Sequence, residues 1–151
     1  MTFALVLLLT ASPQAALQIN QEPTVFRDPP ACWNGSQHEM TVCAGKELQQ
    51  SEAEMNAQLA RVETLMSRLD ADAGPPNEII GNYSRTEALR RGQAAWLTFR
   101  LEHCRIQGAG GGSMARMLIH LCERDATRLR TLQLNTLMLN PATGNPYYED
   151  Q

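Results

Sequence analysis

Four cysteines constrain this chain more than any other feature, because each bridge that they form fixes a meeting point between two segments. They are Cys32, Cys43, Cys104 and Cys122, and all lie in or beside sequence with a helical pattern. An even number of cysteines in a short chain indicates disulfides, which form and persist in oxidising compartments. The sequence therefore predicts a helical module that is stapled by disulfides and located outside the cytoplasm.

An uncharged apolar segment precedes the first cysteine. Phe3 to Leu9 is followed by small residues, and its length fits the core of a signal peptide and falls short of a membrane span. We expect residues 1–16 to be a signal peptide and the proline-containing residues 17–31 to form an extended lead-in. Cys32 lies well beyond the apolar segment, so we expect no lipid anchor. The protein is predicted to be periplasmic or secreted, with no membrane span after processing.

The charge of the chain narrows the class of partner. The formal net charge is −3 at pH 7. Binding to a phosphate backbone requires a concentrated basic surface, so we expect no nucleic acid partner. A mildly acidic chain is instead compatible with attraction to a cationic protein.

Three stretches carry apolar residues at helical spacing, and each follows a serine that can cap a helix. Capping-box pairs stand at Ser36 with Glu39 and at Ser84 with Glu87, and Ser113 is the expected cap of the last helix. Stretches rich in glycine and proline separate the helices, and strand alternation is not convincing anywhere. The sequence therefore predicts an all-α protein.

Each predicted helix has one apolar face. On the first helix this face comprises Met40, Ala44, Leu48, Met55, Leu59, Val62, Met66 and Leu69. On the second helix it comprises Leu89, Trp96, Phe99 and Ile106. On the third helix it comprises Met114, Met117, Leu118, Leu121, Cys122, Leu129, Leu132 and Leu139. We expect these faces to form the core.

Long helices joined by chain reversals bury their apolar faces in a small antiparallel three-helix bundle. The bundle is expected to span residues 32–140, with residues 141–151 as a flexible tail. Four cysteines allow three connectivities. Chain geometry favours two local pairs, one between Cys32 and Cys43 and one between the other two cysteines, because these would pin the lead-in to the first helix and the second helix to the third.

A spaced set of residues runs through most of the predicted domain, from Cys32 to Leu132. It comprises Glu39-Met40, Cys43-Ala44, Glu52, Met55-Asn56, Gln93 to Arg100, Cys104, Gly111 to Met114, Cys122, Thr127 and Arg130. This signature resembles the LprI-like lysozyme inhibitor family. The resemblance implies a small extracytoplasmic helical domain with disulfides, and it implies inhibition of a lysozyme-type muramidase as the activity.

A cluster on the second helix has two interpretations. Gln93, Trp96 and Arg100 lie along one helical face. In the structural interpretation Gln93, Trp96 and Phe99 serve the core, and Arg100 pairs with an acid. The candidate acids are Glu47, Glu52 and Glu54. In the functional interpretation Arg100 binds a carboxylate of the partner, which requires an exposed guanidinium group.

The loop from Gly108 to Ser113 is the other candidate for partner binding. Glycines let a backbone enter a narrow cleft, and a lysozyme cleft presents carboxylates. Backbone N–H groups at Gly111 and Gly112, together with Ser113 and Arg116, are the candidate donors. Alternatively, the loop serves only as a helix reversal that Ser113 caps. Both interpretations can hold at once.

No metal, cofactor or catalytic site is predicted. The histidines and methionines fall where packing or surface placement explains them. The sequence has no C-x-x-C and no H-E-x-x-H motif. The carboxylates lie mostly between apolar positions, as on a solvated helical face, so we expect a non-enzyme. Two functions stay open, which are occlusion of a cell-wall hydrolase and a non-catalytic structural or protein-binding role in the cell envelope.

Overall fold

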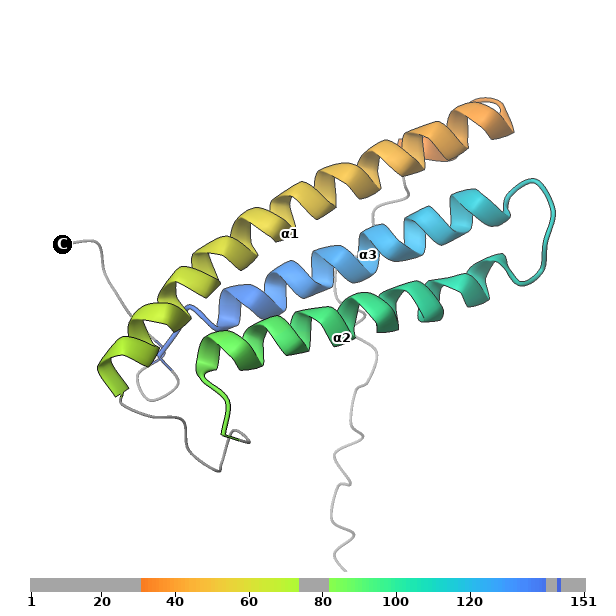
Figure 1. Ribbon diagram of the computed structural model, residues 1–151. Coiled ribbons are helices and arrows are strands. Elements are labelled where there is room, and N and C mark those ends of the chain that lie inside the picture. The colour runs from red at the N-terminus through yellow and green to blue at the C-terminus, as the bar shows by residue number, and fades with distance from the viewer. Residues whose placement is uncertain (1–30, 74–81, 141–143, 145–151) are drawn as a thin grey trace, which may run out of the picture.

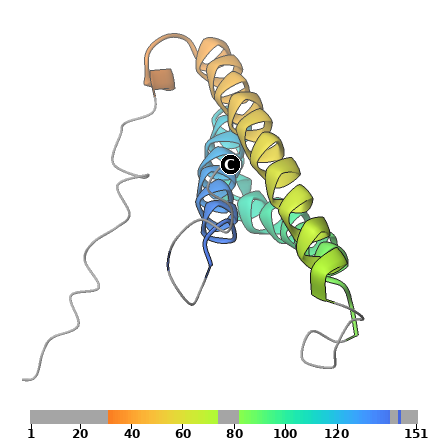
Figure 2. The same ribbon diagram turned by 90° about the vertical axis from the view of Figure 1, so that its left-hand side faces the viewer.

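The computed structural model describes residues 31–73, 82–140 and 144. In chain order its elements are η2 (Ala31–Trp33), α1 (Gln37–Ala73), α2 (Arg85–Arg105), η4 (Ile106–Gly108) and α3 (Ala115–Thr136). The described residues form no strand. The helices α1 and α3 run in the same direction and α2 runs in the opposite one, with α3 drawn between α1 and α2 (Figure 1). Figure 2 shows the same bundle from the side, with α3 next to α1. The predicted all-α three-helix bundle is confirmed.

Some predictions lie outside the described residues. They concern the signal peptide, the lead-in up to residue 30 and, apart from Gly144, the C-terminal tail. Within the described residues, no helix combines the length and the apolar character that a bilayer crossing requires.

The caps of α1 and α2 follow the sequence pattern. The Ser36 hydroxyl accepts from the Glu39 backbone N–H at 3.3 Å, and the Glu39 carboxylate accepts from the Ser36 N–H at 2.7 Å. The Ser84 hydroxyl accepts from the Glu87 N–H at 3.1 Å. Both side-chain caps satisfy N–H groups that have no partner inside the helix. These two predicted helix starts are confirmed.

The start of α3 differs from the prediction. Its cap is Met114, without a side-chain hydrogen bond, and Ser113 lies in the preceding turn. The Ala115 N–H bonds to the Gly112 carbonyl at 3.3 Å, so a backbone group leads the chain into the helix. Gly112 has a φ of +83°, which a residue with a side chain rarely adopts. The prediction of Ser113 as the cap was therefore wrong.

The apolar face predicted for α1 is confirmed, since all of its residues are buried or half-buried. The core has two clusters. The first comprises Met55, Val62, Leu89 and Leu134, with Leu59, Met66, Trp96 and Met138 packed against it. The second comprises Ala44, Met117 and Leu121, with Met40, Met114 and Leu118 packed against it. The residues of the second cluster come from α1 and from the start of α3, so α2 contributes to the core mainly at its N-terminal half.

The faces predicted for α2 and α3 are only partly correct. Phe99 is 59% exposed and Ile106 is 67% exposed on the α2 side. On the α3 side the exposed residues are Leu129, Leu132 and Leu139. Polar side chains take inward positions on this part of α3, where Arg124 and Thr127 are buried. The assignment of Phe99 to the core was therefore wrong.

Both predicted disulfides are confirmed. Cys32 is bonded to Cys43, 11 positions later, and Cys104 is bonded to Cys122, 18 positions later. The first bridge fastens η2 to α1. The second bridge joins the end of α2 to α3 on either side of the glycine-rich loop.

A carboxylate joins the end of α1 to the start of α2. Asp70 accepts from the backbone N–H groups of Arg85 at 2.8 Å and Thr86 at 2.9 Å. Desolvation alone would raise the pKa of Asp70, but hydrogen bonds from Thr86, Arg85 and Ser84 outweigh it and lower the pKa from 3.8 to about 2. A negative charge at a helix N-terminus is also stabilised by the helix dipole. Asp70 therefore caps α2 from another helix.

The depressed pKa of Asp70 makes stability depend on acid pH. The carboxylate stays ionised in the folded protein down to a pKa of about 2, whereas the unfolded chain takes up the proton near 3.8. Its contribution is therefore present above pH 4 and is lost as the pH falls towards 2. We expect Asp70→Asn to lower the free energy of unfolding by about 1 kcal/mol at neutral pH, as for a lost helix cap. Urea unfolding of this variant between pH 2 and 6 should show a shallower loss of stability than the wild type.

The matched control is Asp72→Asn, which changes an exposed carboxylate in the last turn of the same helix. Its pH profile should follow that of the wild type. If the free energy of unfolding fell equally steeply between pH 6 and 2 for Asp70→Asn and the wild type, the capping role of Asp70 would be contradicted.

Candidate functional site

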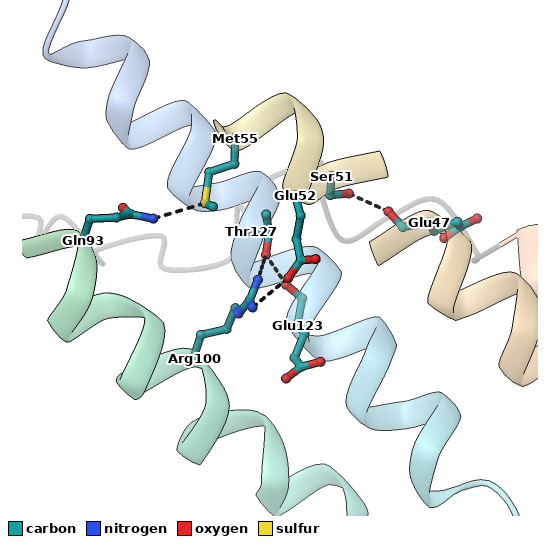
Figure 3. A network of polar contacts seen from close by, with 8 residues as sticks. All are labelled: Glu47, Ser51, Glu52, Met55, Gln93, Arg100, Glu123 and Thr127. Carbon is teal, nitrogen blue, oxygen red and sulfur yellow. Dashed lines mark hydrogen bonds and ion pairs between the residues drawn. The ribbon is translucent and has the colours of Figure 1, made fainter. Parts of the chain in front are cut away.

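The guanidinium group of Arg100 links the three helices at the middle of the bundle (Figure 3). It lies 2.8 Å from a carboxylate oxygen of Glu52 on α1 and donates to the Thr127 hydroxyl on α3 at 2.7 Å. Thr127 in turn donates to the Glu123 carbonyl at 2.6 Å. The Arg100 side chain is only 12% exposed, so this is a partly buried ion pair with charge-assisted hydrogen bonds. Of the candidate acids, Glu52 is the partner.

Gln93 and Trp96 extend this network along α2. The Gln93 amide N–H points at the Met55 sulfur at 3.5 Å, and its carbonyl accepts from Arg130 at 3.0 Å. The guanidinium carbons of Arg100 and Arg130 lie 5.3 Å and 5.8 Å from the centre of the Trp96 ring, within the range of cation–π contacts. Trp96 is half-buried against the first core cluster. The structural interpretation of Gln93, Trp96 and Arg100 thus matches the geometry.

A second buried network was missed in the sequence. Arg124 on α3 is bonded to Glu47 on α1 and, at 2.7 Å, to its neighbour Asp125. Burial alone lowers the pKa of Arg124, but the hydrogen bonds and charges of Glu47 and Asp125 raise it above its ordinary value. Two acids therefore share one cation, which leaves this group with a net negative charge. The sequence shows only an arginine within a helical pattern, and helical periodicity alone assigns such a residue to the solvated face. Its burial is seen only in the structure.

The glycine-rich loop projects at the end of the bundle where α2 turns back into α3 (Figure 1). Gly111 and Gly112 both have positive φ values, and no atom lies within 4 Å of a Cβ placed on either residue. They are exposed, as are Ser113 and Arg116. The disulfide between Cys104 and Cys122 holds the two helices from which the loop emerges. The structure thus brings these four predicted residues together on one exposed tip.

Arg100 does not belong to this tip. Its guanidinium faces Glu52 and Thr127 in the interior, whereas the functional interpretation required an exposed group. Contact between Arg100 and a partner stays a prediction, and the observed geometry favours a role in holding the helices together.

A groove lies between α2 and α3 beside the loop, with a volume of about 490 Å³. We call it the α2–α3 groove, and its lining residues are Phe99, His103, Gln107, Leu118, Leu121, Cys122, Asp125, Ala126 and Leu129. The Phe99 and His103 rings are stacked, with their centres 5.2 Å apart. The sequence indicated apolar residues here but assigned them to the core, so these residues were not expected to line a groove.

One group of possible metal ligands occurs among the described residues. The sulfur atoms of Cys32 and Cys43 and a carboxylate oxygen of Glu47 lie within 4.8 Å of one another. The two sulfurs are joined in a disulfide, so neither is the thiolate that a metal would require. This group does not fit a metal centre.

The comparisons with known proteins agree with the geometry. The family model described as "Lysozyme inhibitor LprI" matches residues 32–134. A similar chain from Rhizobium meliloti (strain 1021), described as an uncharacterized protein, is 35% identical over 106 residues, which cover 68% of this chain and 74% of that protein. No solved structure gives a significant match. The matched residues include all four cysteines, both buried networks and the glycine-rich loop.

Proposed function

Because this chain belongs to the LprI family of lysozyme inhibitors, we propose that it binds a lysozyme-type cell-wall hydrolase and blocks the access of substrate. The observation that carries this proposal is the family match over residues 32–134, which covers almost the whole described bundle. The family is one of inhibitors, so the proposal is for a binding protein that performs no reaction of its own. Binding alone is enough to occlude a cleft.

The tip of the bundle supports this mode of action. The backbone at Gly111 and Gly112 carries no side chain that would keep it away from the walls of a narrow cleft. The exposed Ser113 hydroxyl and the Arg116 guanidinium supply hydrogen-bond donors on the same tip. Glycosidase clefts contain a pair of carboxyl groups that accept such bonds. The disulfide between Cys104 and Cys122 fixes the two helices that carry the loop, which reduces the conformational freedom that the loop must lose on binding.

The proposed location is outside the cytoplasm. Two disulfides are formed and no cysteine among the described residues is free. Disulfides persist in oxidising compartments such as the periplasm and the extracellular space. A net charge of −3 also favours encounter with a cationic hydrolase.

A second candidate is a non-catalytic module of the cell envelope that binds another protein and inhibits no lysozyme. The exposed apolar residues beside the α2–α3 groove favour some protein partner without identifying its class. The direct test is a titration of the oxidised protein into c-type, g-type and i-type lysozymes, with cell-wall lysis and binding both measured. Saturable binding with loss of lysis supports inhibition. Absence of binding to every class would shift the assignment to the envelope module.

The tip residues make a specific prediction. We expect Arg116→Ala to raise the concentration needed for half-inhibition by about tenfold, because a charged hydrogen bond to a carboxylate contributes about 1.5–3 kcal/mol. Ser113→Ala should have a smaller effect in the same direction, since its hydrogen bond is neutral on the donor side. The measurement is a dose–response of lysis with the lysozyme class that binds.

The matched control is Arg128→Ala, which removes an exposed arginine from the same helix far from the tip. It should inhibit like the wild type. Equal inhibition by Arg116→Ala and Arg128→Ala would show that the tip is not the blocking element.

A further inference from the structure

The α2–α3 groove contains apolar surface that the fold does not use. Phe99 is 59% exposed although the chain has only three phenylalanines. Its ring stacks on His103 and stands at the wall of the groove, opposite Leu118 and Leu129 on α3. An exposed aromatic residue beside an apolar groove is typical of an interface hot spot, where a few such residues carry most of the binding energy.

One acidic side chain lines the groove. Among the described residues that line it, Asp125 is the acid, His103 is the one basic side chain, and none is a lysine or an arginine. Asp125 shares Arg124 with Glu47, so the group retains a net negative charge beside the groove. An occupant that fits this chemistry presents an apolar side chain with a basic side chain next to it.

The groove is continuous with the tip of the bundle. Gln107 lines the groove and belongs to η4, and the next residue, Gly108, begins the glycine-rich loop. Cys122 also lines the groove, and its bridge to Cys104 holds the loop's two helices together. A protein bound at the tip therefore lies beside the groove without any change in the fold.

We infer that the α2–α3 groove is the anchoring site for the hydrolase, and that it receives an apolar side chain flanked by a lysine or arginine from the rim of the hydrolase cleft. This inference rests on the proposed inhibitory function and names the surface that supplies its affinity. The loop blocks the cleft, and the groove holds the partner in place. The division explains why apolar residues at Phe99 and Leu129 are exposed along the groove that leads away from the tip.

The test measures the dissociation constant of the oxidised protein for the lysozyme class that it inhibits. Phe99→Ala should raise Kd by about tenfold or more, as expected of a central aromatic anchor. Ala126→Leu, which fills the groove without removing a contact, should weaken binding as well. The control is Leu101→Ala, because Leu101 is 43% exposed on the same helix but does not line the groove. It should leave Kd unchanged, and thermal unfolding of each variant shows that the fold is intact.

The charge is tested by Asp125→Asn, which keeps an oxygen that can accept from Arg124. Its Kd should rise several-fold at low salt and differ little from the wild type at high salt, because salt screens the lost attraction.

The outcomes separate the two proposals. If the wild type binds no lysozyme, the inhibitory function itself fails. If it inhibits and Phe99→Ala binds equally well, only the groove assignment is overturned. Concentration-dependent dimerisation of the wild type that Phe99→Ala abolishes, seen by sedimentation, would assign the groove to a second copy of this chain and would also overturn the inference.

Discussion

Replacement of Arg124 by alanine is expected to lower the free energy of unfolding by about 3–5 kcal/mol, a large fraction of the stability of a small domain. The Arg124 side chain is 5% exposed, and it neutralises Glu47 on α1 and Asp125 on its own helix. Without the guanidinium group, two carboxylates are left side by side in a partly buried place. Each must then lose hydration without compensation or take up a proton.

Urea unfolding at neutral pH measures this effect, and a second variant identifies its cause. In the Arg124→Ala background, Glu47→Gln should restore part of the lost stability, because it removes one of the two uncompensated charges. If the loss came only from the missing side-chain volume, Glu47→Gln would restore nothing. Arg128→Ala is the matched control on the exposed face of α3 and should change stability by less than about 0.5 kcal/mol. A loss below about 1 kcal/mol for Arg124→Ala would contradict the buried role.

The helices and their connections could be predicted because the signals are local. Capping pairs such as Ser36 with Glu39 act within one turn, and the apolar face of α1 repeats over the whole helix. The two disulfides join cysteines that are 11 and 18 positions apart, where short connections limit the possible geometry. Short stretches of sequence therefore contained the information needed to predict the helix caps, the apolar face of α1 and the disulfides.

The core of α2 and α3 could not be predicted in full, because polar residues take buried positions there. Periodicity assigns an apolar residue to the inside and a charged residue to the outside. Arg124 and Thr127 reverse this assignment, since their partners come from other helices. Phe99 and Leu129 then remain on the outside. The groove follows from this exchange, and only the three-dimensional pairing reveals it.

The choice of acid for Arg100 shows the same limit. The sequence left three acids open, and the structure selects Glu52. Glu47 is already engaged with Arg124, so one pairing restricts the other. A network of this kind is decided by the relative placement of three helices, which no single stretch of sequence contains.

Loss of the Cys104–Cys122 disulfide is expected to reduce both stability and inhibition. The bridge closes a loop between positions 18 apart, which corresponds to about 3 kcal/mol of chain entropy in the unfolded state. We expect the double variant Cys104→Ser with Cys122→Ser to lose about this much free energy of unfolding. Urea unfolding measures the loss, and the comparison is the double variant of Cys32 and Cys43.

The comparison is informative because both bridges are similar in chain entropy but different in position. The Cys32–Cys43 bridge closes 11 positions and fastens η2 to α1 at the same end of the bundle, but it joins neither of the helices that the loop connects. Its loss should destabilise the protein by a similar amount, about 3 kcal/mol. Inhibition at a temperature where both variants are folded should fall only for the Cys104 and Cys122 pair, because only that bridge holds the two helices that carry the tip and the α2–α3 groove. Equal inhibition by the two folded variants would mean that the bundle positions the tip without the bridge, and that the Cys104–Cys122 disulfide serves stability alone.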